Sequence, residues 1–345
     1  MRYFHNDYNR MCHPSVLQRL SSASEIAMPG YGMDDYCDAA AAHVRKLCGK
    51  EDLSVHFLVG GTQTNLTVID AALRPHQGVL CAVTGHINVH ETGAVEATGH
   101  KVIGMPSTDG KVTAQQVEEM AIAHLTDGDR EHTVQPKMVY ISDSTEVGTV
   151  YTRQELKALS DVCKKYGYYL FLDGARLGYA LTSRDSDVTW NDLAEYCDVF
   201  YIGMTKCGAM FGECVVISNA VLAEDFRYLI KQHGGMLAKG WLLGLQFQAL
   251  FENDLYLQIT GNANALADLL RQTLVELGYS FYMEGSTNQV FPILPDNILE
   301  KLSEEVTYSP MGRVDDAHQA VRFCTSWANT REDVEFLCDL LKKLS

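Results

Sequence analysis

The sequence has no surplus of positive charge. Among its 345 residues, 28 are Lys or Arg and 44 are Asp or Glu, so the formal net charge is −16. Nucleic acid is therefore not expected as the main partner, because such binding needs cations that neutralise phosphates. The same charge balance argues against a polybasic membrane anchor. A local basic pocket for a small anion remains compatible with this composition.

Targeting and membrane-spanning segments are also missing. Residues 1–7 lack a basic stretch followed by an apolar one, which a signal peptide would have. The uncharged run at 53–69 is interrupted by His56 and by Gly60-Gly61-Thr62-Gln63-Thr64-Asn65, so it does not resemble a membrane span. No membrane partner is expected.

The ten cysteines form no Cys-x-x-Cys pair. They are scattered from Cys12 to Cys338, and several lie inside apolar runs such as residues 79–83. This distribution favours small buried thiols in a reducing compartment over a disulfide framework or a metal site. The expected location is the cytoplasm.

Short apolar runs alternate with helix-periodic stretches through the first 235 residues or so. The runs are continuous and rich in β-branched and aromatic residues, which is typical of strands covered on both faces. They span residues 55–59, 79–83, 101–105, 138–142, 168–172, 199–203 and 214–218. The clearest helix is predicted over 153–166, where Leu156, Leu159 and Cys163 recur at helical spacing. This alternation predicts a mostly parallel sheet.

The pattern changes after about residue 235. Long helices are predicted over 237–251 and 255–277, followed by strands at 279–283, 290–294 and 321–326 and by helices at 297–305 and 331–344. The sequence therefore predicts an α/β protein with a large domain and a smaller C-terminal α/β domain. We expect an N-terminal segment (1–19) associated with the small domain and the active site, a large domain (20–250) and a small domain (251–345).

A glycine turn joins the strand at 55–59 to a predicted helix. Gly60 and Gly61 let the backbone approach a ligand closely, and free N–H groups at a helix start favour an anion. The alternative is a plain strand–helix turn with Thr62 as the cap. The motif is neither a Walker A loop nor a dinucleotide fingerprint.

Charged side chains follow two other strands. Asp173 ends the strand at 168–172 and Arg176 follows it, at the sheet edge where open α/β sheets bind ligands. The alternative is a structural Asp–Arg pair. Lys206 follows the strand at 199–203, and apolar surroundings would lower its pKa and make it a nucleophile. The alternative is a solvated loop lysine.

The segment after the strand at 79–83 carries His86, His90 and Glu91. Their spacing is not His-Glu-x-x-His, so no metal site is expected. A single histidine placed over a ligand ring fits better. The alternative is a capping or core histidine.

Together, these motifs resemble a site for pyridoxal phosphate, which needs an anion cradle, a ring cover, a carboxylate for the pyridine nitrogen and a lysine. Lys206 follows Asp173 by 33 residues (206 − 173). Order and spacing resemble the fold type I, aspartate-aminotransferase-like enzymes, and more narrowly the threonine aldolase/β-eliminating lyase family. Asp-Gly-Ala-Arg at 173–176 is the most specific match, and residues 287–291 and 321–327 extend it. The resemblance implies a fold type I large domain.

The resemblance also implies a role for each matching residue. Lys206 binds the cofactor covalently, Asp173 pairs with the pyridine nitrogen, and His86 stacks on the ring. Gly60, Gly61 and Thr62 contact the phosphate, with help from Thr205. Arg176 and Arg322 hold the carboxylate of an amino-acid substrate. His132 approaches the substrate β-hydroxyl, and Glu91 matches an acid that follows the stacking histidine.

Four positions depart from the family pattern. Asn6 stands where the family has a serine that touches the substrate carboxylate, and Gly203-Met204-Thr205-Lys206 replaces Ser-x-Ser-Lys. Asp143-Ser144-Thr145-Glu146 replaces Glu-Asn-Thr-His, so a contact to the cofactor's phenolic oxygen passes to Ser144 or weakens. Lys239 replaces an arginine and is a stand-in that could reach a neighbouring subunit's phosphate. These changes indicate a divergent branch.

The resemblance implies cleavage of a β-hydroxy-α-amino acid to glycine and an aldehyde, with His86 or His132 as the base. Elimination of a β-substituent and transamination are alternatives within the same cofactor class. A decayed binding or regulatory module and an unrelated nucleotide-binding α/β protein are alternatives outside it. A homodimer or homotetramer with shared active sites is expected, with the helix at 237–251 either in the interface or in the core of one chain.

Overall fold

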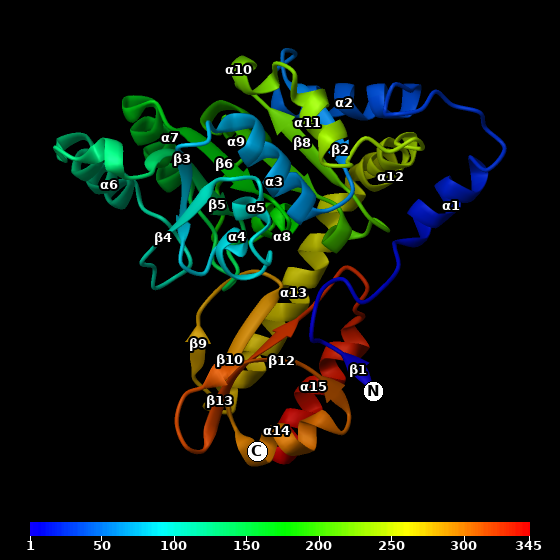
Figure 1. The fold of residues 1–345 in the computed structure, drawn as a ribbon. Helices are drawn as coiled ribbons and strands as arrows, with labels where there is room; N and C mark the ends of the chain where they lie inside the picture. The colour runs from blue at the N-terminus through cyan, green and yellow to red at the C-terminus, as the bar shows by residue number, and fades with distance from the viewer.

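The computed structural model describes residues 1–345. A seven-stranded sheet lies at the centre of its larger part (Figure 1). The strand order is β2-β8-β7-β6-β5-β3-β4. The strands are β2 (Ser54–Leu58), β3 (Gln77–Ala82), β4 (Lys101–Met105), β5 (Gln135–Ser142), β6 (Tyr169–Asp173), β7 (Val199–Gly203) and β8 (Glu213–Ile217). Only β8 runs antiparallel to its neighbours, so the predicted mostly parallel sheet is confirmed.

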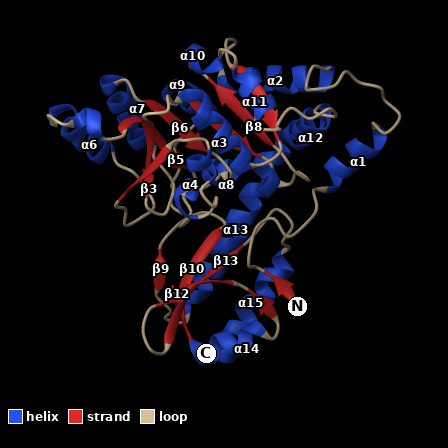
Figure 2. Ribbon diagram, in the orientation of Figure 1, coloured by secondary structure: helices blue, strands red, loops and turns tan.

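Helices cover both faces of this sheet, as Figure 2 shows. One face is covered by α3 (Gly61–Ala72), α4 (His86–Val89), α5 (Ala94–Ala97), α10 (Ala220–Ala223) and α11 (Phe226–Gln232). The other is covered by α2 (Asp35–Cys48), α6 (Ala114–Thr126), α7 (Arg153–Tyr166), α8 (Leu177–Leu181), α9 (Trp190–Tyr196) and α12 (Trp241–Phe251). No helix in the chain combines the length and apolar character that crossing a bilayer requires.

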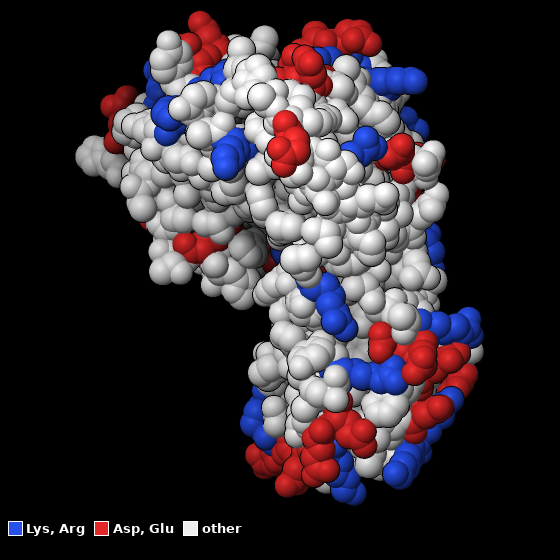
Figure 3. Space-filling model, turned by 90° about the vertical axis from the view of Figure 1, so that its right-hand side faces the viewer, with Lys and Arg blue, Asp and Glu red and all other residues white.

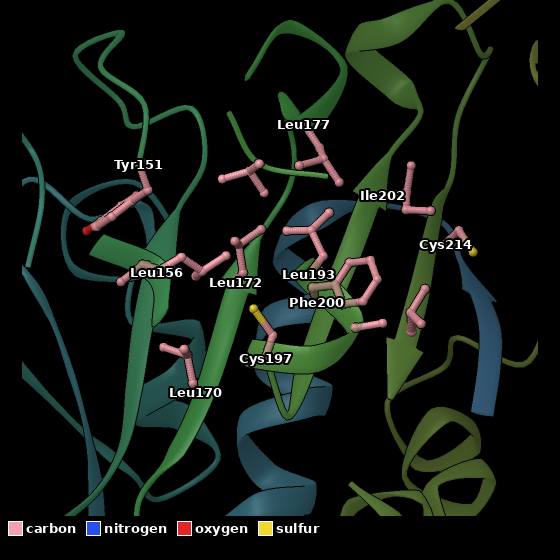
Figure 4. Close-up of a cluster of buried hydrophobic side chains, with 14 of the residues drawn as sticks. Tyr151, Leu156, Leu170, Leu172, Leu177, Leu193, Cys197, Phe200, Ile202 and Cys214 are labelled. Carbon is pink, nitrogen blue, oxygen red and sulfur yellow. The ribbon is translucent and has the colours of Figure 1, made fainter. Parts of the chain in front are cut away.

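Successive residues of a strand enter different hydrophobic cores. Phe200 packs in the cluster of 41 buried residues on one face, and Tyr201 packs in the cluster of 19 on the other. Figure 4 shows part of the larger cluster, with Leu172, Phe200 and Ile202 pointing to the same side of the sheet. Side chains of a strand alternate between faces, so burial of both faces explains why these runs are apolar without a break.

Local signals set the ends of α7. Thr152 accepts a hydrogen bond from the Glu155 N–H, and the Glu155 side chain accepts from the Thr152 N–H, which forms a capping box. Gly167 ends the helix in the left-handed conformation, with φ of 67°. Between these caps, Leu156, Leu159 and Cys163 turn one side of the helix toward the core.

A second, antiparallel sheet forms the smaller part of the molecule, with strand order β12-β13-β10-β9. Its strands are β9 (Phe281–Met283), β10 (Gln289–Pro295), β12 (Ser309–Arg313) and β13 (His318–Cys324). It packs with α13 (Leu255–Glu276), α14 (Asp296–Ser303) and α15 (Arg331–Leu344) around a core of 17 buried residues. The helix α13 links the two parts (Figure 1).

The first residues of the chain belong structurally to the smaller part. Strand β1 (Arg2–Tyr3) pairs in parallel with β11 (Val306–Thr307), and Phe4 is fully buried in the smaller core. Helix α1 (Pro14–Ser22) then packs against α12. Ala263 and Leu266, both on α13, belong to different cores. The domain limits at residues 19 and 250 stay a prediction.

Candidate active site

The carboxyl ends of the parallel strands meet at one edge of the large sheet, where a cavity of about 280 Å³ opens. Nine sequence-predicted residues line it: Gly60, Gly61, Thr62, His86, Ser144, Asp173, Arg176, Thr205 and Lys206. A second cavity of about 650 Å³ adjoins it, because His86, Arg176 and Lys206 line both. Arg322 lines the second cavity from the smaller part of the molecule.

Asp173 lies at the end of β6 and is nearly fully buried. Its carboxylate accepts hydrogen bonds from the Tyr140 and Tyr201 hydroxyls, from Asn65 Nδ2 (3.1 Å) and from the Ala175 N–H (2.9 Å). Burial opposes ionisation, but the attraction of His86 and these hydrogen bonds outweigh it, so the pKa of Asp173 lies below its usual value. The cavity therefore contains a fixed negative charge.

His86 begins the short helix α4 and is held at two points. Its ring Nδ1 lies 2.7 Å from Oε1 of the buried Glu91, and its backbone N–H donates to Glu146 Oε1 at 2.9 Å. Asn65 donates to both Glu91 (2.8 Å) and Asp173, which ties the histidine support to the aspartate. The ring orientation is thus fixed beside the cavity.

Lys206 lies in the 3₁₀ turn Thr205–Cys207, immediately after β7. Burial and the neighbouring Arg176 lower the pKa of its amine, and the attraction of Asp7 and Asp173 opposes them only in part. A lowered pKa increases the fraction of neutral amine near pH 7, which makes a lysine a nucleophile.

The start of α3 forms the anion cradle. Gly60 is its N-cap residue and supplies no side-chain cap, so the first N–H groups of the helix have no capping partner. Thr62 is the second residue of the helix, which removes the interpretation of Thr62 as the cap. A Cβ atom on Gly61 would lie 3.1 Å from the Tyr201 hydroxyl oxygen, so glycine keeps this space open.

Arg176 forms a buried bidentate ion pair with Asp7. The Nε–Oδ2 and Nη2–Oδ1 distances are 2.7 and 3.0 Å, and Asn288 Nδ2 donates to the same carboxylate at 2.9 Å. Despite burial, the charge of Arg176 lowers the pKa of Asp7 to about 2. The pair joins the N-terminal segment and the smaller part of the molecule to the large sheet. One guanidinium nitrogen of Arg176 takes no part in the pair.

Loss of this pair should destabilise the fold. We expect Asp7→Asn to lower the free energy of unfolding by about 3–5 kcal/mol, because the buried guanidinium of Arg176 would lose its counter-ion. The pKa of Asp7 falls from a usual 3.8 to about 2, so its contribution is present above about pH 4 and is lost as the pH falls toward 2. Denaturant unfolding near pH 7 and near pH 3 measures both effects.

The matched control is Asp185→Asn, whose carboxylate is exposed and lies 4.0 Å from Arg184. It should unfold like the unmodified protein, because exposed pairs contribute little. Equal stability of Asp7→Asn and Asp185→Asn at both pH values would contradict the role of Asp7.

Four predicted residues do not line either cavity, and one of them, Glu91, contacts the site only through His86 and Asn65. His132 is exposed before the eight-residue β5, whose far end is about 26 Å away at the cavity. Within one chain, the structure therefore separates His132 from the site. Asn6 instead accepts a hydrogen bond from the Tyr8 N–H at 3.1 Å, and Lys239 is exposed before α12.

Several residues that the sequence analysis did not propose also line or support the site. They are Asp7, Tyr8, Tyr140, Tyr201, Glu146 and Glu213. Position along the chain could have indicated two of them, because Tyr140 lies near the end of its strand and Glu146 follows that strand. No local signal identifies Asp7, because its partner is 169 residues away.

The chain belongs to the Beta-eliminating lyase family, which it matches over residues 16–296. A low-specificity L-threonine aldolase of Pseudomonas sp. (strain NCIMB 10558) is 32% identical over 303 residues, which are 86% of this chain and 85% of the relative. A solved structure of Leishmania major threonine aldolase is 42% identical, with a TM-score of 0.97, and the match covers 100% of this chain and 99% of the other.

More distantly related enzymes share this fold. An aspartate aminotransferase variant of Thermus thermophilus shares it with a TM-score of 0.70 at 17% identity, over 99% of this chain and 91% of the other. The chain therefore has the fold type I architecture of pyridoxal-phosphate enzymes, as the sequence predicted.

The residues present fit pyridoxal phosphate. The uncapped start of α3 offers N–H groups to a phosphate. The buried Ser144 Oγ has no hydrogen-bond partner, so a polar atom remains available to a ligand. Asp173 offers a carboxylate to a pyridine nitrogen, and Lys206 offers an amine to an aldehyde.

Proposed function

We propose that this protein is a pyridoxal-phosphate-dependent aldolase that cleaves a β-hydroxy-α-amino acid, such as L-threonine or L-allo-threonine, to glycine and an aldehyde. The observation that carries the proposal is that Lys206, Asp173 and two arginines, Arg176 and Arg322, line connected cavities. The threonine aldolases among its relatives support the same reaction.

Bound pyridoxal phosphate supplies an electron sink for a bond broken at the substrate Cα. The anionic Asp173 holds a proton at the pyridine nitrogen. The uncapped start of α3, with Thr62 and Thr205, binds the phosphate. Lys206 would hold the cofactor through its side-chain amine.

The remaining residues act on the substrate. Arg176 and Arg322 bind its carboxylate and thereby orient the bonds at Cα. His86, held by Glu91, accepts the β-hydroxyl proton directly or through a water molecule. A base at this position typically contributes about 10²–10⁴-fold to the rate. His86 carries this role within one chain, because His132 lies away from the cavities.

The direct test is an absorbance spectrum of the purified protein, repeated after addition of L-threonine, L-allo-threonine and glycine, with an aldehyde assay alongside. A visible cofactor band that shifts with glycine, together with aldehyde release, supports an aldolase and ranks the substrates. A band with pyruvate and ammonia release indicates β-elimination, and dependence on a keto acid indicates transamination. Absence of a band after reconstitution with pyridoxal phosphate contradicts the proposal.

Arg322 provides a test of substrate binding. Its Nε is buried without a partner, while Nη1 and Nη2 make long contacts of 3.3 Å to Gln289 Oε1 and His5 O. We expect Arg322→Gln to lower kcat/KM by about 10–100-fold, mainly through a higher KM, because a charged hydrogen bond is lost.

The matched control is Arg313→Gln, on the neighbouring strand β12. Arg313 is half-exposed and pairs with Asp296 outside the cavities. An unchanged KM in Arg322→Gln, or an equal increase in both variants, would contradict carboxylate binding by Arg322.

We also propose a cytoplasmic homodimer or homotetramer with shared active sites. The ten cysteines are all unpaired and buried, which suits a reducing compartment. On the side that carries α1 in Figure 1, Figure 3 shows few charged side chains over much of the larger part. Leu17, Ile26, Tyr31 and Met33 are 42–63% exposed, which supports an apolar contact. Molar mass in solution by light scattering tests the assembly.

A further inference from the structure

Glu213 is a buried acid at the cavity with no direct cationic partner. It is the first residue of β8, and because β8 is antiparallel, its amino end lies at the same sheet edge as the other site residues. Glu213 is 4% exposed and lines the 280 Å³ cavity together with Gly60, Gly61 and Thr62. Its two carboxyl oxygens accept hydrogen bonds from the Met204 N–H (3.0 Å) and from Thr205 Oγ1 (2.9 Å).

The Thr205 hydroxyl links Glu213 to the anion cradle. Thr205 Oγ1 accepts the Gly212 N–H at 3.0 Å and has one proton to donate, for which Glu213 Oε1 at 2.9 Å is a nearer acceptor than the Gly212 carbonyl oxygen at 3.3 Å. An ionised Glu213 can only accept, so it holds that proton and also repels an anion in the cavity. A protonated Glu213 can donate to Thr205 Oγ1, which frees the Thr205 proton for another acceptor.

We propose that Glu213 carries a proton whenever the phosphate of the cofactor is bound, taking that proton up on binding where the cofactor-free protein has Glu213 ionised, and thereby turns the Thr205 hydroxyl to donate to that phosphate. This inference rests on the proposed function, since the phosphate is that of pyridoxal phosphate. The proton comes from solvent and adds to one Glu213 oxygen, with no other bond made or broken. Glu213 is thus a positioning residue that acts through Thr205.

The surroundings of Glu213 hold its pKa in a range where the carboxyl group readily gains or loses a proton. Burial raises its pKa to about 8, while the Met204 N–H, the Thr205 hydroxyl and the charge of Lys206 favour the ionised form. A phosphate dianion in the same cavity would add a like charge and raise this pKa further. The protein without cofactor should therefore hold less than one proton on Glu213 above about pH 8.

Few other groups near Glu213 change charge in this range. The neighbouring Asp173 has a lowered pKa, the pKa values of Tyr201 and Tyr256 lie well above the usual one, and the pKa of Cys207 is about 12. Two other groups that line the same cavity could exchange the proton: Lys206, whose pKa is lowered by burial, and Glu146, whose pKa is raised by burial. The experiment must separate Glu213 from both, and a variant of Glu213 itself does so.

The test is calorimetric titration of the cofactor-free full-length protein with pyridoxine 5′-phosphate, which has no aldehyde to react with Lys206. Titrations in two buffers of different ionisation heat give the number of protons taken up. The phosphate is a dianion throughout about pH 7–9, because its second pKa is about 6. Pyridoxine is the matched ligand, since it has the same ring and lacks the phosphate.

We expect the uptake beyond that of pyridoxine to rise from near zero at about pH 7 toward one proton at about pH 9. The affinity should then fall by up to about tenfold per pH unit above about pH 8. Glu213→Gln should remove both effects, because its amide can donate to Thr205 without a proton from solvent. Lys206→Ala should keep the uptake but move it to higher pH, because it removes the charge that favours ionised Glu213.

The opposite pattern, uptake that persists in Glu213→Gln and disappears in Lys206→Ala, would overturn the inference. Absence of extra uptake in the unmodified protein would overturn it without any variant, so it can be decided even if Glu213→Gln does not fold. Failure of pyridoxine 5′-phosphate to bind, together with no cofactor band, would contradict the proposed function itself. A bound cofactor without Glu213-dependent uptake would contradict only this inference.

Discussion

Lys206→Ala is expected to abolish the covalent cofactor absorbance and to lower turnover by about 10⁴-fold or more. Lys206 is the one lysine that lines either cavity, and burial lowers the pKa of its amine. Removing a nucleophile typically costs several orders of magnitude, because the groups around it cannot act alone. The measurements are a visible absorbance spectrum after reconstitution and the rate of aldehyde release from L-threonine.

Lys157→Ala is the control for this variant. Lys157 is an exposed residue of α7 that pairs with Asp161 and lines neither cavity. It should keep both the absorbance and the turnover. Full turnover in Lys206→Ala would contradict the proposed mechanism as a whole.

Asp173→Asn is expected to leave the cofactor bound and to lower turnover by about 10²–10³-fold. The substitution removes the negative charge that holds a proton at the pyridine nitrogen. It also places an amide N–H₂ group among donors from Tyr140, Tyr201, Asn65 and Ala175, where one carboxyl oxygen had accepted. Some loss of stability should accompany the loss of activity, because buried donors lose their acceptor.

Tyr201→Phe separates these two effects. It removes one hydrogen bond to Asp173 and retains the carboxylate, so turnover should fall by about tenfold or less. The measurements are cofactor content by absorbance and aldehyde release for both variants. Cleavage of L-threonine by Asp173→Asn at the rate of the unmodified protein would show that the role of Asp173 is wrong.

The strands of the large sheet were predictable because both of their faces are buried, which makes their sequences continuously apolar. Strands β4 and β7 have the predicted limits, and α7 and α15 do as well. Helix α12 starts at Trp241, later than the predicted residue 237. Residues 237–240 lie outside the helix, and Gly240, its N-cap residue, approaches another segment so closely that a Cβ atom there would be 3.0 Å from the Gly32 backbone nitrogen.

The smaller sheet was predicted less completely. Strand β12 has the sequence Ser-Pro-Met-Gly-Arg, which contains no apolar alternation. It is an edge strand, where proline and exposed residues are tolerated. Strands β1 and β11 have two residues each, too few for any pattern, and they form only because the two segments meet.

The site was predictable where chemistry and position coincide. Asp173 and Lys206 are charged residues at the ends of apolar strands, so they stand out in the sequence. Tyr140 and Tyr201 lie within strands buried on both faces, and such strands give no alternation that would show which side chains face Asp173. Glu213 was not predicted, because the sequence of β8 does not show that this strand runs antiparallel to its neighbours.

The pairing of β1 with β11 has a consequence for synthesis on the ribosome. About 300 residues separate these two strands, so β1 leaves the ribosome roughly 15–60 s before its partner at about 5–20 residues per second. The large sheet is complete in the nascent chain by Ile217, well before then. Asn288, which donates a hydrogen bond to the Asp7 carboxylate beside Arg176, and Arg322, which lines the second cavity, also leave the ribosome late. The active site is therefore completed among the last steps of folding, and a nascent chain should stay catalytically silent until then.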